Sequence, residues 1–286
     1  MPAFSLVVCV CRERDLLERL LEKAAGCYDD LVVVHDGPDA VNIRALVEQC
    51  GGRFFERPRA FQQEPHWPFA WEQAKHDWIL RLDADEFPSV PLKEWLANFR
   101  TAPDPGDAVS GYTCLWPLWD GRKATTKNWP GGRYFLFQKN RVRFFGMAET
   151  APMPDGRCEP LKLILHHQPK RKSYGVRNII FRKQAYHWRR VIAQSLTGKP
   201  TDLPCWRWDS PEWPPQWEAL RQHPLRTALF RLIWFPLCNA RAHWKNEGKI
   251  IFSDVLNPGL HHFLLCLCYF WQSRISGRTE KKTLRH

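Results

Sequence analysis

Acidic residues directly follow an apolar segment in the first third of the chain. The run 78–82 predicts a buried strand, and Asp83, Asp85 and Glu86 come immediately after it, with one alanine between the two aspartates. A carboxylate near a core needs a partner, because burying an unpaired charge is costly. Two carboxylates at a strand end can share a hard divalent cation, which can hold the phosphates of a nucleotide. A turn with solvated acids is the alternative, and the motif alone does not separate the two.

Strands and helices are predicted to alternate through the first hundred residues. Apolar runs at 4–11 and 31–34 predict buried strands, and leucines at a helical period across 14–25 predict a helix between them. Together with the strand at 78–82, this alternation is typical of a doubly wound α/β half with a parallel sheet. Ligands of such sheets bind at the carboxyl ends of the strands, which is where Asp83 stands.

Asp36 stands at the end of the second predicted strand and is followed by Gly37. Asp-Gly is ordinary turn chemistry, so a purely structural turn residue is one interpretation. The other is a hydrogen-bond acceptor for a ligand, and the strand-end position favours it.

The middle of the chain predicts a different kind of strand. Short aromatic segments between residues 111 and 146, split by Gly and Pro, predict antiparallel strands. One more strand, over 161–165, ends in His166 and His167. A Pro-rich stretch over 201–215 then predicts a linker or a wrapped loop.

Two strongly apolar helices are predicted over 225–238 and 261–271. They carry Trp, Phe and Leu beside arginines such as Arg226 and Arg231, a composition that suits an interfacial helix on an anionic membrane. Packing against the rest of the protein is the alternative, and both hold if one face packs and the other meets lipid. We predict three regions: a catalytic domain over 1–195, a linker over 196–224 and an amphipathic helical extension over 225–286.

Composition limits the classes of protein and of partner. The chain has 286 residues with 15 Trp and 13% aromatic residues, which argues against disorder. The formal charge of +12, concentrated after residue 122, favours anionic partners such as phosphorylated substrates, anionic lipid or nucleic acid. Ten cysteines without a CxxC pair predict reduced thiols in a cytoplasmic protein. Neither a secretory leader nor a run of about 20 apolar residues is predicted.

Four local patterns, in this order, resemble the family 2 glycosyltransferases, and most closely their lipopolysaccharide-core β-glucosyltransferase branch. The patterns are the opening strand leading to Arg12-Glu13, the turn Asp36-Gly37, the run 77–86, and a distal group of Arg133-Tyr134-Phe135, 145–149 and His166. The likeness covers most of residues 4 to 190, and the run 77–86 is its most specific part.

The chain departs from the family pattern at three places. Arg12-Glu13 stands where Asn-Glu is usual, Ala148-Glu149 where His-Glu is frequent, and Trp67-Pro68-Phe69 where a polar Arg-Asn pair usually opens the helix. These departures affect the expected substrate more than the expected fold. The resemblance implies a nucleotide-sugar-binding, GT-A type, Rossmann-like mixed sheet, and we expect the C-terminal helices to form a membrane-facing extension.

The resemblance also implies roles for individual residues. Asp85 and His166 would hold Mg²⁺ or Mn²⁺, and Glu149, placed among aromatic residues that raise its pKa, would be the catalytic base. The nucleotide sugar would be bound by a set of polar residues at the strand ends: Arg12, Glu13, Asp36, Asp83 and Arg133.

Each role has a structural alternative. Asp85 could instead pair with a nearby arginine such as Arg81, and Glu149 could be a surface residue of a Gly- and Pro-rich loop. His166 could be a hydrogen-bonded structural histidine, and Arg133 a solvated residue beside a glycine turn.

The resemblance implies an inverting, metal-dependent transferase that moves a hexose from a UDP-linked or similar nucleotide sugar to a lipid-linked or lipopolysaccharide-core glycan. It would work in the cytoplasm, peripherally on the cytoplasmic face of the inner membrane, with no nucleic acid as partner. Two alternatives stay open at this point. The charge and the interleaved Trp and Arg also permit a single-stranded nucleic-acid-binding protein, and a catalytically silent membrane-associated relative is the third interpretation.

Overall fold

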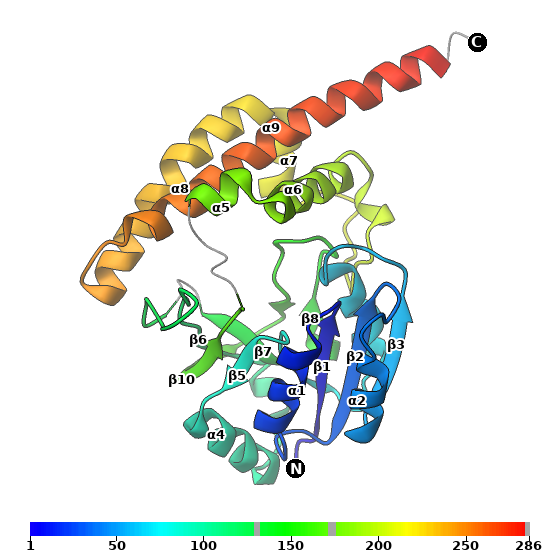
Figure 1. Ribbon diagram of the computed structural model, residues 1–286, viewed down its shortest axis with the longest axis vertical. Helices are drawn as coiled ribbons and strands as arrows, with labels where there is room; N and C mark the ends of the chain where they lie inside the picture. Colours follow the sequence, from blue (N-terminus) through cyan, green and yellow to red (C-terminus); the bar gives the residue numbers. More distant parts are fainter. Residues whose placement is uncertain (129–131, 171–175, 284–286) are drawn as a thin grey trace. The chain divides into compact units, whose positions relative to one another are not determined.

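The computed structural model describes residues 1–128, 132–170 and 176–283, and the chain divides into two compact units (Figure 1). The first unit comprises Met1–Arg171 together with Pro204–Trp208, and the second comprises Lys172–Leu203 together with Asp209–His286. The chain therefore leaves the first unit, returns to it for a few residues, and leaves it again.

The first unit is built on an eight-stranded sheet of order β3-β2-β1-β4-β7-β6-β10-β5. Four neighbouring strands at one end of this order are parallel: β1 (Phe4–Val10), β2 (Asp30–Asp36), β3 (Arg53–Arg57) and β4 (Trp78–Arg81). Every residue of β1, β2 and β4 is buried, as expected for parallel strands covered on both faces. The predicted alternation in this half is confirmed.

Helices cover both faces of the parallel strands (Figure 1). One face packs against α1 (Arg14–Lys23), α2 (Ile43–Gln49) and α4 (Val90–Thr101), whose buried leucines share a core with the even-numbered apolar residues of β1. The other face packs against α3 (Trp67–Gln73), together with the odd-numbered apolar residues of β1. Because side chains alternate along a strand, β1 contributes to both layers.

The second half of the sheet is mixed. β7 (Arg133–Gln138) lies antiparallel between β4 and β6 (Gly111–Leu115). β10 (Cys158–His167) is parallel to β6, so the prediction that this strand joins an antiparallel set holds only for its other neighbour, β5 (Glu86–Pro88). The mixed α/β fold with C-terminal helices is confirmed.

Short elements complete the first unit. β8 (Val142–Arg143) and β9 (Met153–Pro154) form a separate two-stranded sheet. Single 3-10 turns are η1 (Glu64–His66), η2 (Gly106–Ala108) and η3 (Lys139–Arg141).

The returning segment Pro204–Trp208 is held by backbone and aromatic contacts. Trp206 and Phe144 exchange two backbone hydrogen bonds of 2.9 Å, and the Trp206 ring meets the Trp71 ring edge-on at 5.7 Å. Gly146 allows the close approach, because its φ is +78° and a Cβ there would lie 2.6 Å from the carbonyl oxygen of Pro204.

The second unit is helical. Its elements are α5 (Val176–Phe181), α6 (Lys183–Ser195), the turn η4 (Pro200–Asp202), α7 (Pro215–Gln222), α8 (Pro224–Glu247) and α9 (Phe252–Thr283). The two predicted apolar helices exist as α8 and α9, but both run well beyond the predicted 225–238 and 261–271. They pack closely, since a Cβ on Gly259 would lie 2.7 Å from Pro236 Cδ. No helix within the described residues is long and apolar enough to cross a bilayer.

Candidate active site

A tight turn carries the acidic motif from β4 into β5. The backbone N–H of Glu86 donates to the Asp83 carbonyl (2.9 Å), and the Asp83 N–H donates to Glu86 Oε2 (2.9 Å). The Glu86 side chain is fully buried, whereas the side chains of Asp83 and Asp85 are 20% and 23% exposed. The turn therefore buries the Glu86 carboxylate and leaves those of Asp83 and Asp85 partly exposed at the strand end.

Arg133 reaches the acidic turn from the adjacent strand β7. Its Nη2 lies 2.5 Å from Asp83 Oδ2, and its Nε lies 3.0 Å from Glu86 Oε1. Trp116 Nε1 also donates to Glu86 Oε1 at 2.7 Å. The guanidinium is only 19% exposed, so the alternative of a solvated arginine is wrong, and its main contacts are the two carboxylates.

The two carboxylates that contact Arg133 have pKa values shifted in opposite directions. Burial raises the pKa of Glu86 above its ordinary value, because desolvation outweighs the attraction of Arg133. Burial also opposes ionisation of Asp83, but the charges of Arg133 and Arg81 outweigh it and lower the Asp83 pKa. Asp83 is thus held as an anion at the strand end.

Arg81 completes this buried charge cluster from inside β4. It is 3% exposed, stacks 4.3 Å from the Trp67 ring centre, and donates from Nη2 to the Tyr134 carbonyl at 3.1 Å. Burial, followed by the charge of Arg133, lowers the Arg81 pKa to about 10. Within the described part of the chain Arg81 forms no ion pair with Asp85.

His167, and not the predicted His166, lies beside Asp85. His167 Nε2 is 3.5 Å from Asp85 Oδ2, and the imidazole stacks on the Trp116 ring at 4.2 Å. The two histidines are consecutive in β10, so they point to opposite faces of the strand. Burial, with a contribution from the charge of Lys23, lowers the pKa of His166. The sequence pattern identified the histidine pair at the end of this strand, but it did not indicate which of the two faces Asp85.

The donor set at Asp85 suits a cation that also binds phosphate. Among the described residues no three His, Cys, Asp or Glu side chains gather into a complete metal site. Mg²⁺ is commonly bound by one or two carboxylates plus substrate phosphates and water, and Mn²⁺ also accepts imidazole. Asp85 and His167 fit this partial coordination.

Glu149 differs from its predicted environment. It is exposed, so the expectation of a carboxylate partly buried among aromatic residues is wrong. Its backbone has φ of 63°, a left-handed conformation that is costly for a residue other than glycine and concentrates at functional sites. The negative charges of Glu149 and Asp83 both contribute to a raised pKa of Glu64, so both carboxylates lie near Glu64.

Glu64 is a site residue that the sequence did not reveal. It lies on η1, is 6% exposed, and its Oε2 has no hydrogen-bond partner. Burial, reinforced by the charge of Asp83, raises its pKa to about 7. The only signal in the sequence is an isolated acid in the aromatic and Pro-rich stretch before α3, which also fits a surface turn.

Asp36 binds the loop that carries Glu64. Its carboxylate accepts the backbone N–H groups of Ala60 and Phe61 and the Nε2 of His66 (3.0 Å), with Arg59 Nε at 3.4 Å. Burial opposes ionisation, but the His66 and backbone hydrogen bonds outweigh it and lower the Asp36 pKa. The carboxylate therefore contacts protein donors on both oxygens.

Arg12 and Glu13 lie where β1 ends and α1 begins. Glu13 Oε2 accepts the backbone N–H groups of Cys11 and Arg12, each at 2.9 Å, and both Arg12 and Glu13 are exposed. The Cys11 sulfur lies 2.7 Å from Arg59 Nη1, so this turn adjoins the loop bound by Asp36. The carboxyl ends of β1 and β2 thus form one polar edge.

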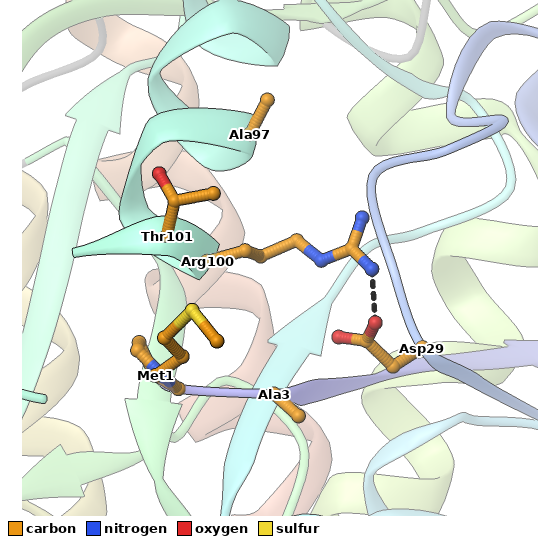
Figure 2. A pocket seen from close by; sticks show the side chains of 7 residues that line it. Met1, Ala3, Asp29, Ala97, Arg100 and Thr101 are labelled. Atoms are coloured by element: carbon orange, nitrogen blue, oxygen red, sulfur yellow. Dashed lines mark hydrogen bonds and ion pairs between the residues drawn. The ribbon is translucent and has the colours of Figure 1, made fainter. Parts of the chain in front are cut away.

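A separate hollow of about 520 Å³ lies at the start of β1, away from the acidic turn. Figure 2 shows Arg100 of α4 reaching Asp29 across it, and the two side chains form an ion pair. Met1 and Ala3 also line this hollow, which contains none of the residues of the acidic turn.

The mixed sheet with acids at the carboxyl end of β4 defines a GT-A type nucleotide-sugar transferase fold. Residues 5–151 match the model of glycosyl transferase family 2, and the chain belongs to this family. It is therefore a glycosyltransferase, and this family membership favours an enzyme over the alternative of a nucleic-acid-binding protein.

Solved structures with low sequence identity are also similar. S. aureus TarS in complex with UDP shares 13% identity over 87% of this chain and 76% of that chain, with a TM-score of 0.44. CMP:2-keto-3-deoxy-manno-octonic acid synthetase with CTP shares 13% identity over 48% of this chain and 71% of that chain (TM-score 0.30). GlyE of Streptococcus pneumoniae TIGR4 shares 12% identity over 49% of this chain and 35% of that chain, with a TM-score of 0.29. No curated protein sequence matches the chain.

Proposed function

We propose that this glycosyltransferase is an inverting, metal-dependent enzyme that moves a hexose from a UDP-sugar to a lipid-linked or lipopolysaccharide-core glycan. The proposal places it in the lipopolysaccharide-core β-glucosyltransferase branch of its family. The observation that carries the chemistry is the turn after β4, where Asp83 and Asp85 are presented beside Arg133 and His167.

Departure of the diphosphate requires positive charge at its oxygens. We propose that Asp85 and His167 hold Mg²⁺ or Mn²⁺, which when bound supplies that charge. Asp83, kept anionic and oriented by Arg133, faces the nucleotide. Arg133 thus acts on the donor through Asp83, and direct contact with a phosphate would require it to release one of its carboxylate partners.

The nucleotide side of the site would be formed by the polar edge at β1 and β2. Arg12 and Glu13 are exposed there and available to a ligand. Asp36 holds the 59–66 loop against this edge, so we propose that it shapes the nucleotide site, and that a contact with the base would replace one of its present donors.

Attack on the sugar requires the acceptor hydroxyl to lose a proton. We propose Glu149 as the group that takes it, because its carboxylate is exposed, lies near Glu64, and stands on a backbone in a left-handed conformation. Inversion follows if acceptor and leaving diphosphate lie in line on opposite faces of the sugar.

We propose that catalysis resides in the region 1–195 and that the helical region 225–286 places the enzyme peripherally on the cytoplasmic face of the inner membrane, where a lipid-linked acceptor would be found. The charge of +12 and the exposed apolar side chains of α8 support this location.

The test is turnover and binding of nucleotide sugars by the purified chain. Donor should raise the melting temperature in the presence of Mn²⁺, by mass action, and the chain should release UDP from UDP-hexoses. Asp85→Ala should abolish metal-dependent turnover, whereas Asp107→Ala, at a fully exposed aspartate, should not. Full activity of Asp85→Ala would refute the proposed mechanism.

A further inference from the structure

The outer face of α8 exposes an unusual amount of apolar surface. Seven large side chains of this helix are 45% to 65% exposed: Leu225, Leu229, Phe230, Ile233, Trp234, Leu237 and Trp244. Four of them follow one another at intervals of four residues, and with 3.6 residues per turn all seven fall within about one half of the helix circumference. Soluble monomers rarely expose a contiguous apolar surface of this kind.

The opposite side of α8 is already used for packing. Thr227, Ala228, Arg231 and His243 are buried, and Arg231 Nη2 donates to the Gln216 carbonyl of α7 at 2.5 Å. The helix is therefore seated within its own unit by one side. The exposed apolar side is left for a different partner.

Cations lie among the exposed apolar residues. Arg226, Arg241 and Lys245 are exposed on α8, and the only acidic residue of the helix is Glu247, at its last position. Long basic side chains can bury their methylene stems in an apolar layer and place their charges at its polar boundary. An apolar side with interspersed cations is typical of helices that lie in the surface of an anionic bilayer.

The same charges disfavour a second copy of the chain as the partner. In a symmetric dimer the same patch meets itself, so the cations of one copy would be brought towards the cations of the other. Anionic lipid headgroups instead complement these cations.

We propose that the outer face of α8 binds an anionic bilayer, with the seven apolar side chains at the boundary between headgroups and acyl chains and with Arg226, Arg241 and Lys245 at lipid phosphates. This inference rests on the proposed membrane location and assigns it to one helix face. The whole helix of 24 residues would lie in the membrane plane over about 36 Å.

Co-sedimentation of the full chain with vesicles tests the assignment. The wild type should bind vesicles of phosphatidylcholine mixed with phosphatidylglycerol, and bind phosphatidylcholine alone more weakly. The double variant Ile233→Glu/Leu237→Glu should weaken binding roughly tenfold or more, since it places charge in the apolar layer. Arg226→Gln/Arg241→Gln should reduce the preference for phosphatidylglycerol. Val90→Glu, at an equally exposed apolar position on α4, is the matched control and should bind as the wild type does.

Three results would overturn the assignment. They are failure of the wild type to bind anionic vesicles, unchanged binding of the Ile233→Glu/Leu237→Glu variant, and a lipid-free dimer that this variant dissociates in sedimentation velocity. Release of UDP from UDP-hexose in the absence of lipid is measured on the same samples. Folding of the variant is checked by circular dichroism and by this activity, which should match the wild type. A wild type that binds vesicles but releases no UDP would refute the transferase mechanism and leave the lipid-binding face standing.

Discussion

Replacing Glu64 by glutamine should stabilise the protein at neutral and alkaline pH but not at acid pH. Burial raises the pKa of the Glu64 carboxyl from its ordinary 4.5 to about 7. At about 1.4 kcal/mol for each pKa unit, the ionised form disfavours the folded state by roughly 3 kcal/mol. Glutamine has nearly the shape of the protonated acid and does not ionise.

The sign follows from which state binds more protons. Below about pH 4.5 Glu64 is protonated in both the folded and the unfolded chain, so it exerts no pH effect. Between about pH 4.5 and 7 the unfolded chain loses this proton first, and the free energy of unfolding falls as the pH rises. Above about pH 7 the full penalty applies. Relative to its own value at acid pH, Glu64→Gln should therefore gain up to roughly 3 kcal/mol over the wild type.

The assay is urea unfolding of both proteins between pH 4.5 and 8.5, with melting temperatures as a second readout. For a unit of this size, roughly 3 kcal/mol corresponds to a relative rise of roughly 6 to 12 °C. Glu72→Gln, at an exposed position on α3, is the matched control and should follow the wild type. A Glu64→Gln variant whose stability depends on pH in the same way as the wild type would refute the assignment of a buried, protonated Glu64.

Two further predictions concern the acidic turn. Arg133→Met leaves Asp83 and Glu86 without their main counter-charge and should lower the free energy of unfolding by about 3–5 kcal/mol, with partial recovery in Arg133→Lys. Urea unfolding measures both variants, and an unchanged midpoint for Arg133→Met would contradict the described ion pairs. His167→Ala should weaken Mn²⁺ binding in the presence of UDP by roughly tenfold or more, whereas His166→Ala should leave it nearly unchanged. Titration calorimetry distinguishes the two, and the reverse ranking would return the proposed metal ligand to His166.

The parallel half of the fold was predictable because its signals are local. Buried parallel strands consist almost entirely of apolar residues, and the leucine period of α1 is unambiguous, so the strand ends that carry Asp36 and Asp83 could be placed from the sequence. The order of the remaining strands was not predictable. β7 inserts between β4 and β6, and this depends on long-range pairing that no short pattern encodes.

The site residues likewise divide into those that a local sequence pattern identifies and those whose placement depends on long-range packing. Asp85 follows a strand and could be recognised, but the choice between His166 and His167 depends on which face of β10 meets the acidic turn, and that face is set by pairing with β5. Arg133 was recognised as a site residue, yet its contacts with Asp83 and Glu86 follow from the adjacency of β7 and β4. Glu64 could not be recognised, because its burial arises from packing around η1 and leaves no pattern in the sequence.

The return of Pro204–Trp208 to the first unit has a consequence for how the protein can be divided. A polypeptide that ends at residue 171 or 195 lacks Trp206, which contacts Trp71 and pairs with Phe144. Such a truncation exposes an aromatic surface that the whole chain covers, so loss of solubility or activity in it would not show that the helical unit takes part in catalysis. A shortened chain that keeps the first unit intact must retain these five residues, for example through an engineered short connection that replaces α5 and α6.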